Sequence, residues 1–169
     1  MSINKRFAHV VILMVLMVLM FIFIILNTGY SYRDEIISMG YGNPEVLRKY
    51  HTDKITNTFI CPTGEFVQIV QTKGYHDGLV FAVVIKGNEI ADVVILAHNE
   101  SKDYGEHVTK QWFLDRLKLK TDELLNIAIL SKEKENDVVA ITGATITSQA
   151  VVVGVNDCII NYRRYLNEK

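Results

Sequence analysis

The sequence predicts an α+β protein, an antiparallel sheet with flanking helices, preceded by one N-terminal transmembrane helix. Three features lead to this fold class. Val10–Leu26 is an unbroken apolar run. Three stretches rich in β-branched and aromatic residues follow one another between Glu65 and Ala97, separated by turns that contain glycine. A helical pattern of apolar residues then runs from about Ser148 to Leu166.

The apolar run Val10–Leu26 predicts a membrane anchor, because about 17 residues is the lower end of what spans a bilayer as a helix. Lys5 and Arg6 precede the run, whereas Arg33 beyond it is followed by two acids. The positive-inside rule therefore predicts a single-pass protein of the cell (inner) membrane. Its N-terminus is expected in the cytoplasm and the rest of the chain outside.

A cleaved signal peptide is the alternative for this run. The run is longer than a usual signal-peptide core, and no small-x-small cleavage site follows it. We therefore expect an uncleaved anchor. The predicted organisation is a cytoplasmic stub and transmembrane helix at 1–29, a stalk and leading helix at 30–64, and one extracytoplasmic domain at 65–169.

Composition excludes several classes of protein. The net charge of −1 argues against a nucleic-acid-binding surface. The only two cysteines, Cys61 and Cys158, do not form a metal-binding motif. A disulfide between them is permitted outside the cell, and buried free thiols are the alternative. No constellation of nucleophile and base is visible, so no catalytic residue and no metal site are predicted.

The first part of the outer domain predicts one helix and three strands. Asn43-Pro44-Glu45 is typical of a helix start and predicts a short helix to about Tyr50, whereas His51–Thr63 shows no clear period. Three consecutive antiparallel strands are predicted, with a hairpin turn at Lys86–Glu89 between the last two. The strands are Glu65–Thr72, Leu79–Ile85 and Ile90–Ala97.

The second part predicts two helices and two short strands. They are a helix at His107–Leu117, a strand at Ile127–Leu130, a charged loop at Ser131–Asp137, a strand at Val138–Ile141 and the final helix. One face of that helix is expected to be apolar. It carries Val151, Val155, Cys158, Ile159, Tyr162 and Leu166.

The turn from Thr142 to Ser148 is the strongest candidate for a binding site. Gly143 and Ala144 allow a ligand to approach the backbone, and the first N–H groups of the following helix favour an anion. Four hydroxyl side chains lie in this turn and can bind a phosphate or carry one covalently. They belong to Thr142, Thr145, Thr147 and Ser148. An ordinary helix N-cap explains the same residue types, so both interpretations stay open.

Thr142-Gly143-Ala144-Thr145 resembles the Ser/Thr-Gly-Ala-Thr motif of the FMN-binding domain family. That family includes the G subunit of Rnf electron-transport complexes and the C subunit of the sodium-pumping NADH:quinone oxidoreductase. In the family the last threonine carries FMN through a phosphoester bond made by a separate flavin transferase. The resemblance implies FMN as the cofactor, Thr145 as its carrier, and Thr142, Gly143, Ala144 and Thr147 as contacts of the flavin.

A second motif supports this resemblance. The stretch 98–105 resembles the family's His-x-Glu-Thr-Pro-Gly-Leu-Gly loop, which lies against the flavin ring. His98, Glu100 and Gly105 match it, and Ser101 replaces threonine. Lys102-Asp103-Tyr104 departs from Pro-Gly-Leu, and the aromatic ring of Tyr104 can stack on the flavin. From the residues alone, His98 is equally a hydrogen-bonded strand end and Glu100 a solvated loop acid. Upstream, Gly74-Tyr75 resembles the family's Gly-Tyr-x-Gly turn.

One residue departs from the family's flavinylation signature. The family has an acid three positions before the Ser/Thr of the motif, and this chain has Val139. The nearest acid, Asp137, lies two residues upstream, more than about 6 Å away along an extended strand. Asp137 replaces the missing acid only if the loop bulges. Reversibly bound FMN and a domain without flavin therefore remain alternatives to the covalent link.

The resemblance implies an electron-carrier subunit rather than an enzyme on its own. Its function would be to relay electrons through FMN in an Rnf-type ion-translocating electron-transport complex. The expected partners are integral-membrane subunits and, for maturation, the flavin transferase; no nucleic acid is expected. A stand-alone anchored electron carrier and a flavin-less scaffold are the alternatives.

Overall fold

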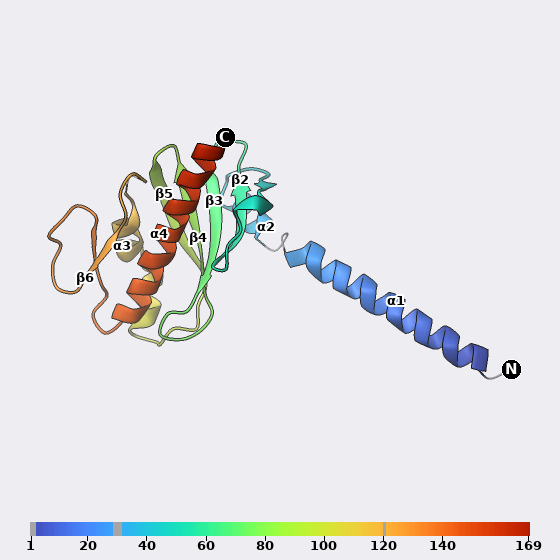
Figure 1. Ribbon diagram of the computed structural model, residues 1–169. Helices are drawn as coiled ribbons and strands as arrows, with labels where there is room; N and C mark the ends of the chain where they lie inside the picture. Colours follow the sequence, from blue (N-terminus) through green and yellow to red (C-terminus); the bar gives the residue numbers. More distant parts are fainter. Residues whose placement is uncertain (1–2, 29–31, 120) are drawn as a thin grey trace.

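The computed structural model describes residues 3–28, 32–119 and 121–169 (Figure 1). Its α-helices are α1 (Ile3–Thr28), α2 (Arg33–Ser38), α3 (Gln111–Leu114) and α4 (Thr145–Glu168). Its strands are β1 (Glu45–Val46), β2 (Ile55–Ile60), β3 (Phe66–Thr72), β4 (Leu79–Lys86), β5 (Glu89–Ala97), β6 (Asn126–Ala128) and β7 (Asp137–Val139). Three short 3-10 helices, η1 (Arg48–Tyr50), η2 (Gly105–Thr109) and η3 (Asp115–Leu117), complete the elements.

The α+β class with an antiparallel sheet is confirmed. The five-stranded sheet has the order β1-β2-β3-β4-β5, with every neighbouring pair antiparallel. The three predicted strands correspond to β3, β4 and β5, and the predicted hairpin turn joins β4 to β5 through the pair Lys86 and Glu89. A separate two-stranded sheet pairs β6 with β7 in parallel.

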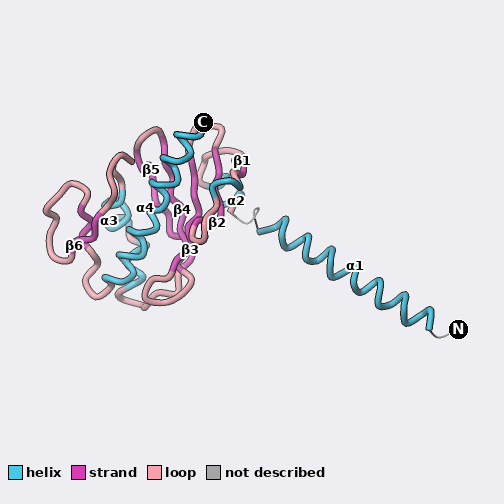
Figure 2. The backbone as a smooth tube through the Cα atoms, in the orientation of Figure 1, coloured by secondary structure: helices cyan, strands magenta, loops and turns pink. Residues whose placement is uncertain are grey.

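The two faces of the five-stranded sheet pack against different segments. Phe66, Val70 and Phe81 point to the side covered by α4, which runs along the sheet (Figure 2). Their sequence neighbours point to the other side, where Ile36 of α2 covers them. This alternation is the period of two that a strand imposes. Because both faces are covered, β4 is buried from Leu79 to Ile85 and reads as a continuous apolar run.

The predicted helix from Asn43 to Tyr50 is wrong. The chain forms β1 and η1 there, because Glu45 pairs with Ile60 of β2 and the Leu47 N–H donates to the Thr58 carbonyl at 2.7 Å. Pairing with a distant strand outweighs the local helix signal of Pro44. β2 itself was not predicted. The segment 30–64 therefore contributes α2, β1 and β2.

Two other helix predictions need correction. The helix predicted at His107–Leu117 is divided into η2, α3 and η3. η2 is separated from α3 because Lys110 is extended, with φ −77° and ψ 135°. The final helix begins at Thr145 rather than Ser148. Its apolar face is buried as predicted at Val151 to Tyr162, but Leu166 is 44% exposed, and the neighbouring Tyr165 packs on Phe66 of β3 in its place.

Both cysteines are free and buried. Cys61 lies in the cluster on the α2 side of the sheet, and Cys158 lies in the cluster on the α4 side. The sheet separates the two thiols, so the structure supports the free-thiol alternative. Burial raises the pKa of Cys61 to about 11 and that of Cys158 well above its usual range. Both are therefore neutral thiols at physiological pH.

The predicted anchor Val10–Leu26 falls in α1, where the side chains from Val11 to Ile24 are all exposed. Judged on the part of the chain that the structure describes, no helix is long and apolar enough to span a membrane. The domain boundary predicted at residue 29 lies outside the described residues.

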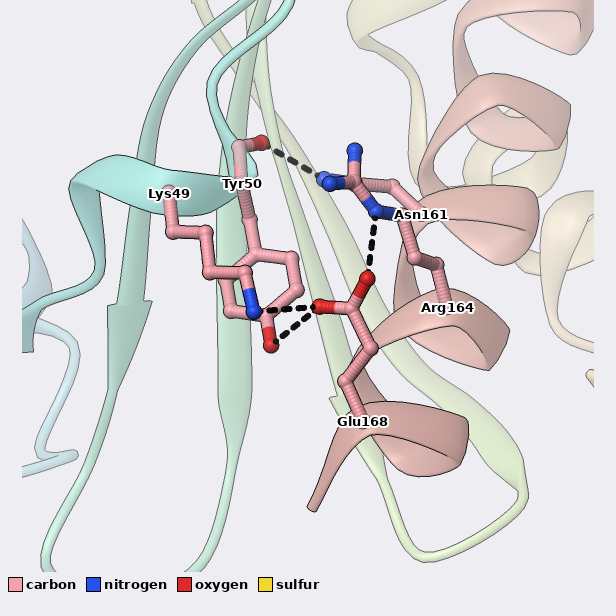
Figure 3. A network of polar contacts seen from close by, with 5 residues as sticks. All are labelled: Lys49, Tyr50, Asn161, Arg164 and Glu168. Atoms are coloured by element: carbon pink, nitrogen blue, oxygen red, sulfur yellow. Dashed lines mark hydrogen bonds and ion pairs between the residues drawn. The ribbon is translucent and has the colours of Figure 1, made fainter.

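A buried hydrogen-bond network fastens α4 to the sheet. The Asn161 side-chain amide donates to the Tyr50 carbonyl at 2.7 Å (Figure 3). It also donates to the Gln68 side-chain oxygen at 2.7 Å. Gln68 in turn donates to the Cys158 carbonyl at 2.9 Å. All of these polar atoms lie in the interior, where a lost partner cannot be replaced by water.

Asn161→Ala is expected to lower the free energy of unfolding by about 2 kcal/mol, because it leaves the buried Gln68 side-chain oxygen without a donor and leaves the Tyr50 carbonyl with only the bond from the Thr58 hydroxyl. Urea unfolding followed by circular dichroism measures the change. Asn167→Ala, on an exposed part of the same helix, is the control and should stay within about 0.5 kcal/mol of the parent. Equal stability of the two variants would contradict the role assigned to Asn161.

Near this network, the exposed Glu168 carboxylate forms ion pairs with Lys49 and Arg164 and accepts a hydrogen bond from the Tyr50 hydroxyl (Figure 3). Hydrogen bonds from Lys49 and then Arg164 lower the pKa of Glu168 from its ordinary value of 4.5 to about 2. A lowered folded-state pKa stabilises the fold above the ordinary value, and this contribution is lost as the pH falls toward 2. Comparing the parent with Glu168→Gln in urea, we expect the parent's advantage at neutral pH to shrink between these two values. A difference that does not change with pH would exclude this ion cluster as its source.

Candidate functional site

One cleft brings together the two segments that the sequence singled out. Its volume is about 510 Å³, within the range of small-molecule sites. One wall comes from the turn after β3 and the loop after β5, and the other from the start of α4. The lining residues are Tyr75, Ser101, Tyr104, Gly143, Ala144, Thr145, Ile146 and Thr147.

The wall at the start of α4 is a tight turn. Gly143 has φ +78°, a left-handed conformation that favours glycine. Ser148 holds the turn, since its hydroxyl donates to the Ala144 carbonyl at 2.9 Å and accepts from the Ile141 N–H at 3.0 Å. Thr145 is the first residue of α4 and is exposed. Its hydroxyl therefore lies at the positive end of a 24-residue helix, where an anionic group is favoured.

The Glu100 carboxylate links the two walls of the cleft through hydrogen bonds beneath its surface. This side chain is only 8% exposed. Its Oε2 accepts a hydrogen bond from the Thr147 hydroxyl at 2.6 Å, and Thr147 is itself fully buried. Its Oε1 accepts a hydrogen bond from the His76 backbone N–H at 3.2 Å. Gly105 packs against Glu100 so closely that a Cβ there would lie 2.9 Å from Oε2. One carboxylate thus joins the turn after β3, the loop after β5 and the first turn of α4.

The loop after β5 is ordered by its own backbone. Asp103 has φ 68°, the only non-glycine residue with positive φ among those that the structure describes. Glycine, which favours this left-handed conformation, stands at this position in the motif that the loop resembles. The Ser101 hydroxyl accepts from the Gly105 N–H at 3.4 Å, and the Ser101 carbonyl accepts from the Glu106 N–H at 3.1 Å.

Tyr104 extends from this loop to the opposite wall. Its ring lies directly on Gly143, where an added Cβ would lie 2.9 Å from the ring carbon Cε1. The ring is nevertheless 56% exposed, because its other side borders the cleft. The contact between Tyr104 and Gly143 therefore joins the two walls above the buried Glu100.

The structure gathers most of the predicted site residues. Ser101, Tyr104, Gly143, Ala144, Thr145 and Thr147 line the cleft, and Glu100 and Gly105 lie beneath it. Thr142 is exposed in the turn but does not line the cleft. His98 is half-buried after β5, and its buried Nδ1 has no hydrogen-bond partner in the described structure.

The sequence did not indicate Tyr75 and Ile146 as lining residues. Tyr75 is 61% exposed and Ile146 is 58% exposed, and both border the cleft. The signal for Tyr75 was present in the Gly74-Tyr75 turn. For Ile146 the only signal was its place beside Thr145, because an isolated isoleucine in an amphipathic helix is indistinguishable from a core residue.

Asp137 does not take the place of the acid missing at Val139. β7 is extended and pairs with β6 at both residues, so no bulge shifts Asp137 forward. The Asp137 carboxylate accepts the N–H groups of Lys134 at 2.8 Å and Glu133 at 3.0 Å, which lower the pKa of Asp137. The Asp137 carboxylate therefore stabilises the charged loop that precedes it. The Val139 carbonyl accepts from Arg116 Nη1 at 2.8 Å.

Residues 74–160 match the FMN-binding domain family. This span contains both walls of the cleft. The chain belongs to the FMN-binding domain family. FMN is therefore its cofactor, as the two motifs predicted. The cleft fits this group, because it combines a small-molecule volume with a helix N-terminus that favours a phosphate.

Two relatives extend the comparison. The chain is 30% identical over 95 residues to the G subunit of the proton-translocating ferredoxin:NAD(+) oxidoreductase complex of Clostridium ljungdahlii, covering 56% of this chain and 51% of the relative. It is 30% identical over 128 residues to the G subunit of the Na(+)-translocating ferredoxin:NAD(+) oxidoreductase complex of Acetobacterium woodii, covering 74% of this chain and 60% of the relative. The chain thus spans between half and three fifths of these relatives.

A solved structure shares the fold. The C subunit of the Na(+)-translocating NADH-quinone reductase from Parabacteroides distasonis superimposes with a TM-score of 0.55 over 65% of this chain and 62% of its own. At 17% sequence identity this similarity describes the fold alone. The predicted resemblance to the G subunits is confirmed by these relatives, and the C subunit shares the fold.

Proposed function

We propose that this protein is a membrane-anchored flavoprotein subunit that relays electrons through FMN in an Rnf-type ion-translocating electron-transport complex. FMN would be attached to Thr145 by a phosphoester bond. The observation that carries this proposal is the position of Thr145, exposed at the start of α4 and lining a cleft of about 510 Å³. Support comes from family membership and from the relatives, which are subunits of such complexes by name.

The residues around the cleft have separable roles in this proposal. Thr142, Gly143, Ala144 and Thr147 would surround the phosphate end, where the α4 dipole favours negative charge. The loop after β5 would contact the ring through His98, Ser101 and Tyr104. Glu100 would not contact the flavin itself but would position Thr147 and His76, because its two oxygens accept hydrogen bonds from these residues. When bound, the flavin supplies one- and two-electron redox chemistry, and the protein positions and tunes it.

The anchor is part of the same proposal. Residues 1–29 would form a cytoplasmic stub and one transmembrane helix, and residues 65–169 the extracytoplasmic domain, to which 30–64 contributes strands. The apolar run Val10–Leu26, preceded by Lys5 and Arg6, supports this topology. In the cell (inner) membrane the helix would dock the domain to integral-membrane partner subunits. A flavin transferase would complete its maturation.

Val139 favours a second candidate, FMN held without a covalent bond. The family acid is absent, and Asp137 is engaged by Lys134 and Glu133. If the transferase needs that acid, the cleft would bind FMN reversibly in an anchored stand-alone carrier, or bind none in a scaffold protein.

The intact mass of the full-length protein tests the proposal. The protein is produced in a host that expresses a flavin transferase, denatured, and measured alongside its in-gel fluorescence. A mass increase equal to FMN less water supports the covalent carrier. An unmodified mass excludes it, and titration with free FMN then separates reversible binding from the scaffold.

Val139→Asp is expected to raise the fraction of chains that carry covalent FMN, because it restores the acid that the family signature has at this position. The increase in this fraction should be largest when the amount of flavin transferase limits the attachment of FMN. Intact mass after short co-expression measures the fraction. Asp137→Asn is the matched control and should leave it unchanged, since Asp137 faces its own loop. An identical fraction in the parent and Val139→Asp would show that the acid is dispensable.

A further inference from the structure

Two tyrosines at the cleft are more exposed than aromatic side chains usually are. Tyr75 is 61% exposed on the turn after β3, and Tyr104 is 56% exposed on the loop after β5. Both line the same cleft, and no other aromatic residue is among its described lining. Exposure this large means that neither ring contributes much to the core. Their common position instead places two aromatic surfaces at the ligand site.

The position of Tyr104 is fixed by its backbone and by Gly143. The Tyr104 carbonyl accepts the His107 N–H at 3.1 Å, and Asp103 before it adopts the left-handed conformation. The ring then lies against Gly143, two residues before Thr145. A flavin joined to Thr145 and lying in this cleft would therefore meet the Tyr104 phenol, which lines the same cleft.

We propose that Tyr104 tunes the flavin. Its phenol would pack on one side of the isoalloxazine ring, with Tyr75 close to the same ring. This inference rests on the proposed function, in that FMN occupies this cleft. Tyr104 is one of the residues by which the chain departs from the family loop, which has leucine there.

The chemistry of a phenol gives two measurable consequences. An electron-rich ring stacks better on the electron-poor oxidised flavin than on the reduced one, so it lowers the reduction potential relative to an aliphatic side chain. A phenol close to a photoexcited flavin also transfers one electron to the flavin, and this electron then returns to the phenol. No bond changes and no net oxidation occurs, but the flavin's fluorescence is quenched.

Three variants of the full-length, FMN-loaded protein test the inference. Tyr104→Leu removes the aromatic ring, and Tyr104→Phe keeps its area but not its easily oxidised phenol. Trp112→Phe, on α3 and outside the cleft lining, is the control. FMN per chain is measured first, by mass and absorbance. The fluorescence yield per bound flavin and the midpoint potential are then compared.

We expect the fluorescence yield to rise in both Tyr104 variants, while Tyr75, close to the same ring, continues to quench part of it. The potential should rise in Tyr104→Leu and change little in Tyr104→Phe, while Trp112→Phe leaves both unchanged. Equal yield and potential in the parent and Tyr104→Leu at equal FMN content would overturn the inference and leave the proposed function intact. A parent that carries no FMN, covalent or added, would overturn both. Should Tyr104→Leu fail to fold, the yield of Tyr104→Phe decides alone.

Discussion

Thr145→Ala is expected to abolish covalently bound FMN completely. A phosphoester needs a hydroxyl oxygen, and alanine has none. The effect is all-or-none in the intact mass of the denatured protein, whereas a residue that merely contacts FMN would change the fraction loaded. Thr145→Ser retains the hydroxyl at the same position and should retain the FMN mass increase.

Three neighbouring hydroxyls serve as controls for this prediction. Thr142 is exposed in the same turn but does not line the cleft, so Thr142→Ala should keep the modification. Thr147 and Ser148 are fully buried, with their hydroxyls bonded to Glu100 and the Ala144 carbonyl. They are inaccessible to a transferase. Loss of the mass increase in Thr142→Ala but not in Thr145→Ala would move the attachment site to Thr142.

Gly154→Val is expected to lower the free energy of unfolding by about 3 kcal/mol, at the upper end of the cost of overpacking a core. At Gly154, α4 lies close against the side chains of β3 and β4. A Cβ there would lie 2.6 Å from Phe81 Cζ and 3.0 Å from Val70 Cγ1. Both of those side chains are fully buried and have no free space to move into. The helix must therefore move away from β3 and β4.

Denaturant unfolding of the full chain measures this cost. A melting temperature lower by about 6–12 °C is the corresponding thermal result for a protein of this size. Gln149→Val, on the exposed side of α4, is the matched control and should cost only about 0.5 kcal/mol through helix propensity. Equal losses in the two variants would show that helix propensity, and not the close approach at Gly154, is responsible.

Residues with local signals were predicted well. Leu79–Ile85 has the apolar composition of a strand covered on both faces, and Lys86-Gly87-Asn88-Glu89 has the chemistry of a hairpin turn. Both correspond to the β4–β5 hairpin. The signal of Asn43-Pro44-Glu45 was also local, but it misled, because pairing of Glu45 with Ile60 decides the conformation there. The free energy of such a pairing depends on the partner, which the local window does not contain.

The candidate site shows the same division. The resemblance of Thr142–Thr145 and of the loop 98–105 to the family's motifs indicated the cofactor and most residues around the cleft. The sequence did not show that Glu100 is buried and holds Thr147 and His76. A loop carboxylate has the same sequence signal whether it faces water or the interior. Only the fold distinguishes the two.

The sequence by itself determined the strands β3 to β5, the long final helix, the family and FMN. The strands and the helix follow from residues close together in the chain, whose periodicity is already complete within a short window. The family and FMN follow from the resemblance of two short motifs to those of the family. The tertiary structure alone decided that β1 and β2 extend the sheet, that the two thiols lie on opposite faces, and that Tyr75, Tyr104 and Thr145 border one cleft. These depend on contacts between distant segments, which exist only once α4 packs on the sheet.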